Sequence, residues 1–416
     1  MAINKERLVH RLEALGEIGI DAEGGVTRLA YTPAYCGAEE MVRRWMKEAD
    51  LDVRTDAVGN LIGRRGGRRS ELPCLMLASH IDSVINGGRY DGTLGVLSAI
   101  EVAQALWEDG VVLDRDLEVV IFMDEEGARW GDGLFGSRAM TGQLSAEALE
   151  RADGRGISRA EAMENWGLDP ARFGDAARDP AEIGAYLELH IEQGAVLESE
   201  DIPVGVVDAI AGPLFLEARL YGRADHAGAT PMGELRRDAL AGAAEVVLAA
   251  EAAATATSPS CVATVGRIEA KPSATNVIPG EVMLSLDIRD IDERARNRAE
   301  TSIRQEMASI CERRGLAFRV DEIQRTRPVS TSSASAGAIS DACAGLGLRV
   351  VRMNSGAAHD AQVMTAMADV GMIFVRCRDG VSHSPEEYVT PEDVFVGAQV
   401  MYETVLRLSC DQYETP

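Results

Sequence analysis

One stretch of the chain constrains the fold more than any other, because it is an apolar run of strand length that ends in chemically useful side chains. Residues 75–82 (LMLASHID) end in His80 and Asp82, and the glycine-rich residues 86–92 (NGGRYDG) then bring Asp91. In an extended chain, residues i and i+2 point to the same side, so His80 and Asp82 are predicted to share a face. There the Asp82 carboxylate can fix the tautomer of the His80 ring while the other ring nitrogen binds a cation. Glycines allow the loop to fold tightly and return Asp91 to this place.

Two further apolar runs end in a similar way. Residues 117–123 are almost continuously apolar, which is typical of a buried strand in a parallel sheet, and they lead into residues 124–127 (DEEG). Residues 186–191 form another predicted strand, which closes on residues 190–194 (HIEQG). In open α/β sheets, ligands bind beyond the carboxyl ends of the strands, so segments distant in sequence converge there. The side chains expected to converge are those of His80, Asp91, Glu125, Glu126, His190 and His383.

This set combines imidazoles and carboxylates without thiolates, which suits Zn, Mn, Co or Ni. Five ligands serve two divalent ions well if one carboxylate bridges them, and Asp91 on its flexible loop is the natural bridge. His80 and His190 would complete one ion site, and Glu126 and His383 the other. A bridging water would then lose a proton near neutral pH and become the nucleophile of a hydrolase.

Glu125 neighbours a predicted ligand without having to be one. It is placed to take the proton of the attacking water and to pass it to the leaving nitrogen. The alternative is a polar cleft without metal, because a histidine at a strand end is often a satisfied structural residue and adjacent glutamates are often a solvated pair. The residues alone favour the metal-dependent hydrolase and leave the alternative open.

The length and the order of predicted elements indicate two domains. A chain of 416 residues is too long for one ordinary core, and the pattern changes near residue 212. Residues 1–211 and 328–416 are predicted to form an α/β catalytic domain whose mostly parallel mixed sheet is flanked by helices, with residues 138–183 mainly helical. Residues 212–327 show the order β-α-β-β-α-β, which is typical of a small ferredoxin-like α+β module inserted into the larger domain.

The composition narrows the class of protein. Apolar residues make up 46% and charged residues 26%, as in soluble globular proteins. The formal charge of −25 argues against a nucleic-acid partner, because phosphate contacts need a basic face. No apolar run approaches the length of a membrane span, and residues 1–6 are not typical of a signal peptide. The seven scattered cysteines indicate buried reduced thiols, so we expect a cytoplasmic protein without a membrane partner.

A second set of polar residues lies in and after the predicted insert. His226 could donate a hydrogen bond to the oxyanion of a tetrahedral intermediate, and Arg289 with Asn276 could clamp a substrate carboxylate. Residues 354–360 (NSGAAHD) form a small-residue loop that could offer backbone N–H groups to an anion. The alternatives are ordinary turn chemistry, a surface ion pair for Arg289, and a packing role for His359.

These segments, in this order, resemble the dinuclear metallo-amidohydrolases related to aminoacylase and carboxypeptidase G. Within that family the resemblance is to the branch of N-carbamoyl-L-amino-acid hydrolases and allantoate amidohydrolases, for which the histidine of HIEQG is a mark. The resemblance covers nearly the whole chain. It is carried by residues 79–82, 87–92, 125–127, 190–194, 382–384 and the loop around His226.

The resemblance implies a role for each matching residue. It implies two divalent ions held by His80, Asp91, Glu126, His190 and His383, with Glu125 as the general base. It implies substrate contacts from Gln193, His226, Asn276, Arg289 and the backbone around Ser355 and Gly356. It also implies that the insert is both a lid and the interface of a homodimer, in which His226 reaches the site of the neighbouring subunit.

The substrate is predicted to be small and to carry a carboxylate and a ureido group. Residues 131–137 (GDGLFGS) look more like the carbamoylases, so we expect hydrolysis of an N-carbamoyl-L-amino acid to the L-amino acid, ammonia and carbon dioxide. Allantoate hydrolysis is the alternative, followed by a related amidase or aminoacylase activity. A departure at Ala358, where relatives tend to carry glycine, could alter the pocket. A non-catalytic binding protein on the same scaffold would need a degraded site, and none of the expected residues is missing.

Overall fold

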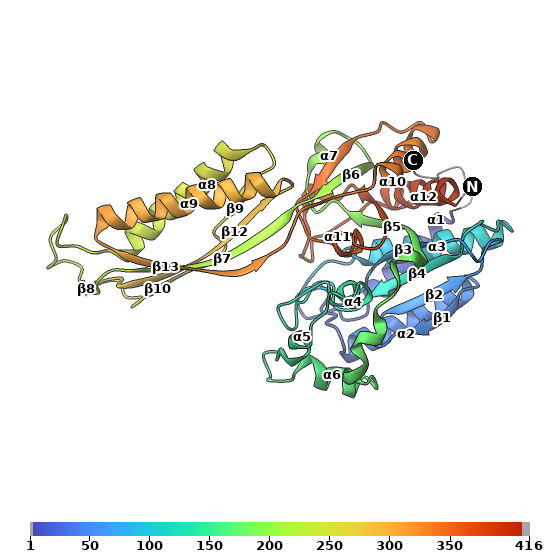
Figure 1. Cartoon of the computed structure of the whole chain (residues 1–416), viewed down its shortest axis with the longest axis horizontal. Coiled ribbons are helices and arrows are strands. Elements are labelled where there is room, and N and C mark those ends of the chain that lie inside the picture. Colours follow the sequence, from blue (N-terminus) through green and yellow to red (C-terminus); the bar gives the residue numbers. More distant parts are fainter. Residues whose placement is uncertain (1–2, 410–416) are drawn as a thin grey trace. The chain divides into compact units, whose positions relative to one another are not determined.

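The computed structural model describes residues 3–409, which form two compact units (Figure 1). The larger unit contains the residues before Ala209, Thr331–Met353 and the residues from His359 onward. The smaller unit contains Ala209–Ser330 and Asn354–Ala358. Residues 354–358, which were expected in the larger domain, thus pack with the smaller unit.

The larger sheet has nine strands in the order β1-β2-β4-β3-β5-β16-β6-β14, and β15 also pairs with β6. The pairs β4/β3, β3/β5 and β5/β16 are parallel, while β1/β2, β2/β4, β16/β6 and β14/β6 are antiparallel. The four central strands, β4, β3, β5 and β16, are all parallel, which confirms the prediction of a mostly parallel mixed sheet at the centre of the fold. The strands are β1 (Asp52–Thr55), β2 (Leu61–Arg65), β3 (Cys74–His80), β4 (Leu117–Phe122), β5 (Ile183–Ile191), β6 (Val204–Ile210), β14 (Val329–Ser330), β15 (Arg352–Ser355) and β16 (Asp369–Val375).

The central strands are buried on both faces, as their continuous apolar sequences require. Every residue of β3 and of β4 is buried. Helices cover the sheet. One layer consists of α1, α3, α10 and α12, which contact one another and the strands β3, β5 and β16. The helices of this unit are α1 (Lys5–Gly16), α2 (Pro33–Glu48), α3 (Thr93–Glu108), α4 (Phe135–Met140), α5 (Glu147–Glu150), α6 (Arg159–Asn165), α7 (Val196–Ser199), α10 (Ser333–Gly345), α11 (Asp360–Met364) and α12 (Pro391–Leu408), with 3-10 turns η1 (Pro170–Ala176), η2 (Pro180–Glu182) and η3 (Arg378–Gly380).

Side-chain alternation along β5 separates the core from the site. Leu189 faces α3 and α12, and α3 approaches so closely that a Cβ on Gly95 would lie 2.2 Å from the Leu189 carbonyl oxygen. Glu188 and His190 point to the opposite side. There the Glu188 carboxylate accepts a hydrogen bond of 3.0 Å from the N–H of Ala361 in α11. The apolar side of β5 therefore anchors the strand, and the polar side faces the site.

The prediction that residues 138–183 are mainly helical is met only in part, because the helices there are short. Only the short helices α5 and α6 and the turns η1 and η2 lie between α4 and β5. Glycines at positions 154, 156 and 167 and prolines at positions 170 and 180 interrupt the helical pattern, because glycine favours turns and proline ends a helix.

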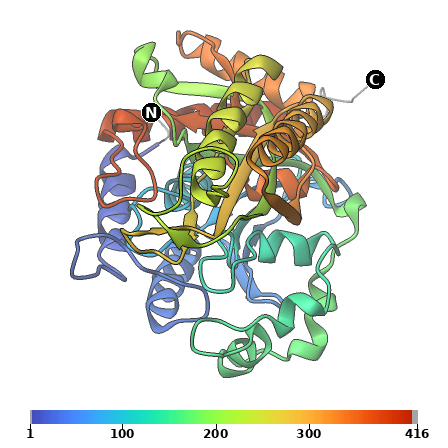
Figure 2. The same cartoon turned by 90° about the vertical axis from the view of Figure 1, so that its left-hand side faces the viewer.

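The smaller unit contains the expected β-α-β-β-α-β order, in which β9 and β10 together take the place of the second strand and the short pair β8/β11 is added. Its antiparallel sheet has the order β10-β12-β7-β13, with β9 paired to β12. Both long helices, α8 and α9, lie side by side on one face of this sheet (Figures 1 and 2). The elements are β7 (Gly212–Tyr221), β8 (Asp225–His226), α8 (Ala239–Thr257), β9 (Val262–Thr264), β10 (Ile268–Lys271), β11 (Val277–Ile278), β12 (Glu281–Asp290), α9 (Glu293–Arg314) and β13 (Ala317–Arg325).

Helix α8 corrects the expectation that no segment approaches the length of a membrane span. Its 19 residues, Ala239–Thr257, are long and apolar enough to cross a membrane. The apolarity comes largely from alanine. Residues along one side of α8, among them Ala243, Val246 and Ala250, belong to the core that this helix shares with α9 and the sheet. The helix thus behaves as the core helix of a globular unit.

The described cysteines agree with the expectation of reduced thiols. All six are free, and all except the half-buried Cys36 are buried; the buried ones are Cys74, Cys261, Cys311, Cys343 and Cys377. The remaining residue, Cys410, lies outside the described residues.

Candidate active site

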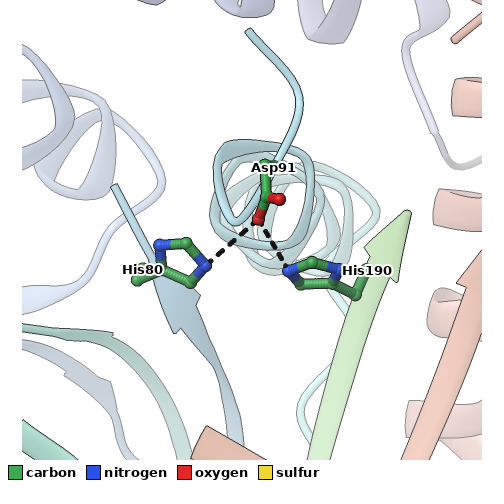
Figure 3. Close-up of side chains that lie close together, drawn as sticks. All are labelled: His80, Asp91 and His190. Carbon is green, nitrogen blue, oxygen red and sulfur yellow. Dashed lines mark ion pairs between the residues drawn. The ribbon is translucent and has the colours of Figure 1, made fainter. Parts of the chain in front are cut away.

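Three of the predicted ligands meet at the carboxyl ends of β3 and β5 (Figure 3). His80 is the last residue of β3, His190 is the penultimate residue of β5, and Asp91 lies in the loop before α3. One oxygen of the Asp91 carboxylate, Oδ1, lies 3.4 Å from Nε2 of His80 and 3.1 Å from Nε2 of His190. All three side chains are buried. The ligand atoms of these three residues all lie within 4.8 Å of one another, so the group could hold a metal ion.

The second oxygen of Asp91 faces a different set of groups. Oδ2 lies 3.2 Å from Nε2 of His383, and that nitrogen lies 3.6 Å from Oε1 of Glu126. Asp91, Glu126 and His383 form a second group whose ligand atoms could hold one ion. The Nε2 amide of Gln193 donates a hydrogen bond of 2.7 Å to the same Oδ2, so Gln193 lies next to this second group. Asp91 is the residue that the two groups share.

The two buried histidine rings have their tautomers fixed by backbone carbonyls. Nδ1 of His80 lies 3.1 Å from the carbonyl oxygen of Asp82, and Nδ1 of His190 lies 3.0 Å from that of Ile191. A carbonyl can only accept, so each neutral ring carries its proton on Nδ1. The Nε2 lone pair of each ring is left facing Asp91, where it can serve as a metal ligand.

Asp82 lies beside His80, as expected, and it also contacts the turn that follows β4. Its carboxylate lies 3.7 Å from Nδ1 of His80, farther than its own carbonyl does. The carboxylate also accepts hydrogen bonds from the backbone N–H groups of Glu125 at 3.2 Å and of Glu126 at 3.0 Å. Because β3 ends at His80, the carbonyl of Asp82 as well as its carboxylate comes close to the His80 ring. Asp82 orients the turn that carries both glutamates.

The same turn is held from its other side by a buried arginine that sequence reasoning missed. Asp124 has a positive φ of 58°, which bends the chain sharply after β4. Its carboxylate accepts a hydrogen bond of 2.9 Å from Nη2 of the fully buried Arg159. The turn presents Glu125 so that its Oε2 lies 3.7 Å from Nε2 of His80.

The site gathers more carboxylates than a buried site can leave uncompensated. Burial raises the pKa of Glu125 well above its ordinary value and, with help from the charge of Asp91, raises the pKa of Glu126 to about 7. Burial alone would raise the pKa of Asp91, but the surrounding histidines outweigh burial and hold it well below its ordinary value. The hydrogen bond to Asp91 in turn raises the pKa of His383 to about 9. The site therefore favours added positive charge.

The residues present fit a pair of divalent cations. Each of the two groups offers imidazole nitrogen and carboxylate oxygen, the donor types that Zn, Mn, Co and Ni accept. Oε1 of Glu126 is buried and has no hydrogen-bond partner, although it points toward His383. A buried carboxylate oxygen without a donor is costly, and a cation would satisfy it.

His226 and Asn276 lie together in the smaller unit. The short strands β8 and β11 pair His226 with Val277, and the N–H of Ala227 donates to the carbonyl of Asn276. Nδ1 of His226 accepts hydrogen bonds from the N–H groups of Gly228 and Ala229, at 3.1 and 3.0 Å. The proton of the neutral ring must then be on Nε2, which leaves His226 as an exposed hydrogen-bond donor.

Arg289 lies far from this pair along β12. The β8/β11 pair is a separate two-stranded sheet beyond the Glu281 end of β12, whereas Arg289 pairs with Pro213 at the other end of β12 (Figure 1). A strand of this length separates its ends by roughly 30 Å at about 3.3 Å per residue. Arg289 is paired with Asp287 at 2.8 Å and donates to the carbonyl of Gly356 at 2.8 Å. The structure therefore brings Arg289 to the backbone of Gly356, the residue after Ser355, and does not bring it together with Asn276.

Sequence reasoning also missed Glu387 and Ser382, which surround the Asp91 loop. The Glu387 carboxylate accepts hydrogen bonds from the N–H groups of Tyr90 and Asp91, and the Ser382 hydroxyl lies 2.9 Å from Oδ2 of Asp91. The sequence contained a signal for this contact, because two consecutive glycines at positions 87 and 88 mark a place where another group approaches the backbone.

Comparison with known proteins places this geometry in context. Residues 76–407 match the model of peptidase family M20/M25/M40. The chain is 46% identical to the N-carbamoyl-L-amino acid amidohydrolase of Geobacillus stearothermophilus, over 98% of this chain and 99% of that protein. It is 42% identical to the N-carbamoyl-L-amino-acid amidohydrolase of Pseudomonas sp. (strain NS671), with the same coverage. It is 35% identical to the allantoate amidohydrolase of Bacillus subtilis (strain 168), over 97% of this chain and 98% of that protein.

Solved structures of similar proteins superpose on this chain over nearly its whole length. A crystal structure of an amidase of the hydantoinase/carbamoylase family from Burkholderia multivorans superposes with a TM-score of 0.90, at 35% identity and 98% coverage of both chains. A crystal structure of AtUAH in complex with (S)-hydroxyglycine superposes with a TM-score of 0.85, at the same identity and coverage.

The glycine after Asp91 provides a test of the site geometry. Gly92 has φ +63°, and a Cβ there would lie 2.4 Å from the His80 ring, whereas Gly110 has φ +66° with nothing within 4 Å of such a Cβ. Backbone strain should therefore lower the stability of Gly92→Ala and of Gly110→Ala by a similar amount, about 1 kcal/mol. We expect only Gly92→Ala to lose bound Mn²⁺, measured as metal content after dialysis. Equal metal contents in the two variants would contradict this account of the loop.

Proposed function

Because the chain belongs to peptidase family M20/M25/M40, whose model matches most of it, we propose that this hydrolase cleaves the ureido C–N bond of N-carbamoyl-L-amino acids. The products would be the L-amino acid, ammonia and carbon dioxide. The observation that carries this proposal is the Asp91 carboxylate, whose two oxygens face two separate groups of potential metal ligands. The substrate class is supported by the relatives at 46% and 42% identity, which are N-carbamoyl-L-amino acid amidohydrolases.

Two divalent ions are proposed to bind at the groups that share Asp91. His80 and His190 would hold one of them with Asp91, and Glu126 and His383 the other. Zn, Mn, Co and Ni all suit these donors. When bound, such a pair of ions would lower the pKa of a water molecule and polarise the carbonyl of the ureido group.

Glu125 is proposed as the general base. Its carboxylate lies beside the first group, 3.7 Å from His80, and Glu125 is not a member of either ligand group among the described residues. Its raised pKa makes it a better proton acceptor than an exposed glutamate, which suits proton transfer near neutral pH. Glu125 would take a proton from the attacking water and deliver it to the leaving nitrogen.

The smaller unit is proposed to act as a lid and as the interface of a homodimer. His226 and Asn276 lie beyond the Glu281 end of β12, and Arg289 lies near its other end, so one copy of the unit cannot direct all three at a single small substrate. A second copy of the chain would resolve this separation. In that arrangement, Nε2–H of His226 from one subunit would donate to the oxyanion, while Arg289 of the other holds the substrate carboxylate.

Allantoate hydrolysis is the second candidate, and it is supported by the relative from Bacillus subtilis. Both substrates carry a ureido group beside a carboxylate, so the same ions and the same arginine would serve either. Gln193, Ser355 and Gly356 are proposed substrate contacts in both cases. The cytoplasmic location and the exclusion of nucleic-acid and membrane partners rest on composition and stay predictions.

Ammonia release from N-carbamoyl-L-amino acids and from allantoate tests the proposed function directly. The purified protein is assayed after chelation and again after addition of Mn²⁺, Co²⁺ or Zn²⁺. We expect activity to disappear on chelation, to return with metal, and to be higher for a carbamoyl amino acid than for allantoate. Full activity after complete metal removal would defeat the metal-dependent mechanism, and preference for allantoate would select the second candidate.

Glu125→Gln tests the general base. The amide keeps the size of the side chain but cannot accept the proton, so kcat should fall by roughly 10²–10⁴-fold. Metal content and melting temperature should stay near the wild-type values, because Glu125 lies outside both ligand groups. Turnover at the wild-type rate by a variant that still binds metal would remove Glu125 from this role.

Arg289→Ala tests the carboxylate contact. If Arg289 binds the substrate carboxylate, KM should rise at least tenfold for carbamoyl amino acids and change little for the corresponding carbamoyl amides. Arg319→Ala is a matched control, because Arg319 pairs with Asp321 at 2.8 Å as Arg289 does with Asp287. An equal rise in KM for acids and amides would assign Arg289 a structural role.

A further inference from the structure

Glu387 connects two loops that each carry a proposed metal ligand. One carboxylate oxygen, Oε1, accepts hydrogen bonds from the N–H groups of Tyr90 at 2.8 Å and of Asp91 at 3.0 Å. The other oxygen, Oε2, lies 3.0 Å from the hydroxyl of Ser382, the residue before His383. The same Ser382 hydroxyl lies 2.9 Å from Oδ2 of Asp91. A closed set of contacts thus joins segments that are 296 residues apart in the chain.

The surroundings of Glu387 are built around its carboxylate. The side chain is only 4% exposed. A Cβ on Gly88 would lie 2.1 Å from the Glu387 carboxylate, so no residue with a side chain fits at position 88 while Glu387 keeps its place. The Tyr90 and Tyr388 rings meet edge to face, with centroids 6.0 Å apart. These contacts fix the carboxylate against the backbone of the Asp91 loop.

The two ligand groups depend on Glu387 to different degrees. His80 and His190 belong to the buried strands β3 and β5, and their rings are held by the backbone carbonyls of Asp82 and Ile191. His383, in contrast, lies in a loop with a positive φ of 56°, and its side chain is 47% exposed. Glu387 contacts the backbone of Asp91 and the hydroxyl of Ser382, the neighbour of His383.

We propose that Glu387 is a positioning residue that sets Asp91 relative to His383 and thereby governs the ion held by Asp91, Glu126 and His383. This inference rests on the proposed two-ion function. Glu387 itself touches neither substrate nor ion in this account. Its loss should weaken the second ion selectively and leave the first ion, which strand residues hold, close to its wild-type affinity.

The test compares Glu387→Gln with the adjacent Glu386→Gln. Both changes remove one negative charge, but Glu386 is exposed, whereas Glu387 accepts three hydrogen bonds from the two loops. Titration of the metal-free protein with Mn²⁺ in a calorimeter gives the number and affinity of ions, and circular dichroism gives the melting temperature. For Glu387→Gln we expect one ion with wild-type affinity, a second weakened at least tenfold, and a fall in kcat that excess Mn²⁺ restores. Glu386→Gln should match the wild type.

The possible outcomes separate the inference from the proposed function. If the wild type binds two ions and Glu387→Gln binds both with unchanged affinity, the inference is wrong and the proposed function stands. If Glu387→Gln weakens both ions equally and lowers the melting temperature, Glu387 is a folding residue and the inference is again wrong. If the wild type does not bind two ions, the proposed function fails and the inference fails with it. Gly88→Ala would place a Cβ 2.1 Å from the Glu387 carboxylate and so displace it without changing charge, which applies the same test if Glu387→Gln does not fold.

Discussion

The structure depends on one buried carboxylate that faces three imidazoles. Asp91 has His80 and His190 on one oxygen and His383 on the other, at separations of 3.1 to 3.4 Å. Burying an anion is costly unless positive charge or hydrogen-bond donors surround it. The fold therefore has to bring side chains from distant segments to one point. The sheet does so together with the loops that carry Asp91 and His383.

Different parts of the fold position the two groups of potential metal ligands that share Asp91. The parallel strands β3 and β5 bring His80 and His190 to the same edge of the sheet, where neighbouring strand ends lie side by side. The other residues of the site lie in loops: Asp91, Glu125, Glu126 and His383. Buried polar residues hold these loops in place. Arg159 and Asp82 fix the turn that carries Glu125, and Glu387 fixes the loop that carries Asp91. A rigid group and a loop-borne group thus share one bridging carboxylate.

The sequence was most informative where a periodic pattern carried the signal. Apolar runs predicted β3, β4 and β5, and the strand-end rule then predicted that His80, Asp91 and His190 lie together. It was least informative where a residue acts through its backbone or across a long separation. The contact of the Asp82 carbonyl with His80 was not predicted because only the carboxylate was considered, and Glu387 was missed because its partners are nearly 300 residues away. The separation of Asn276 from Arg289 follows from the length of β12, because the two residues lie near its opposite ends.

The most direct test of the central claim is a crystal structure of the protein grown with Mn²⁺, with anomalous scattering used to locate the ions. The account predicts two anomalous peaks, one on each side of the Asp91 carboxylate, with His80 and His190 at one and Glu126 and His383 at the other. A single peak, or peaks bound by other residues while Asp91 remains free of metal, would contradict it.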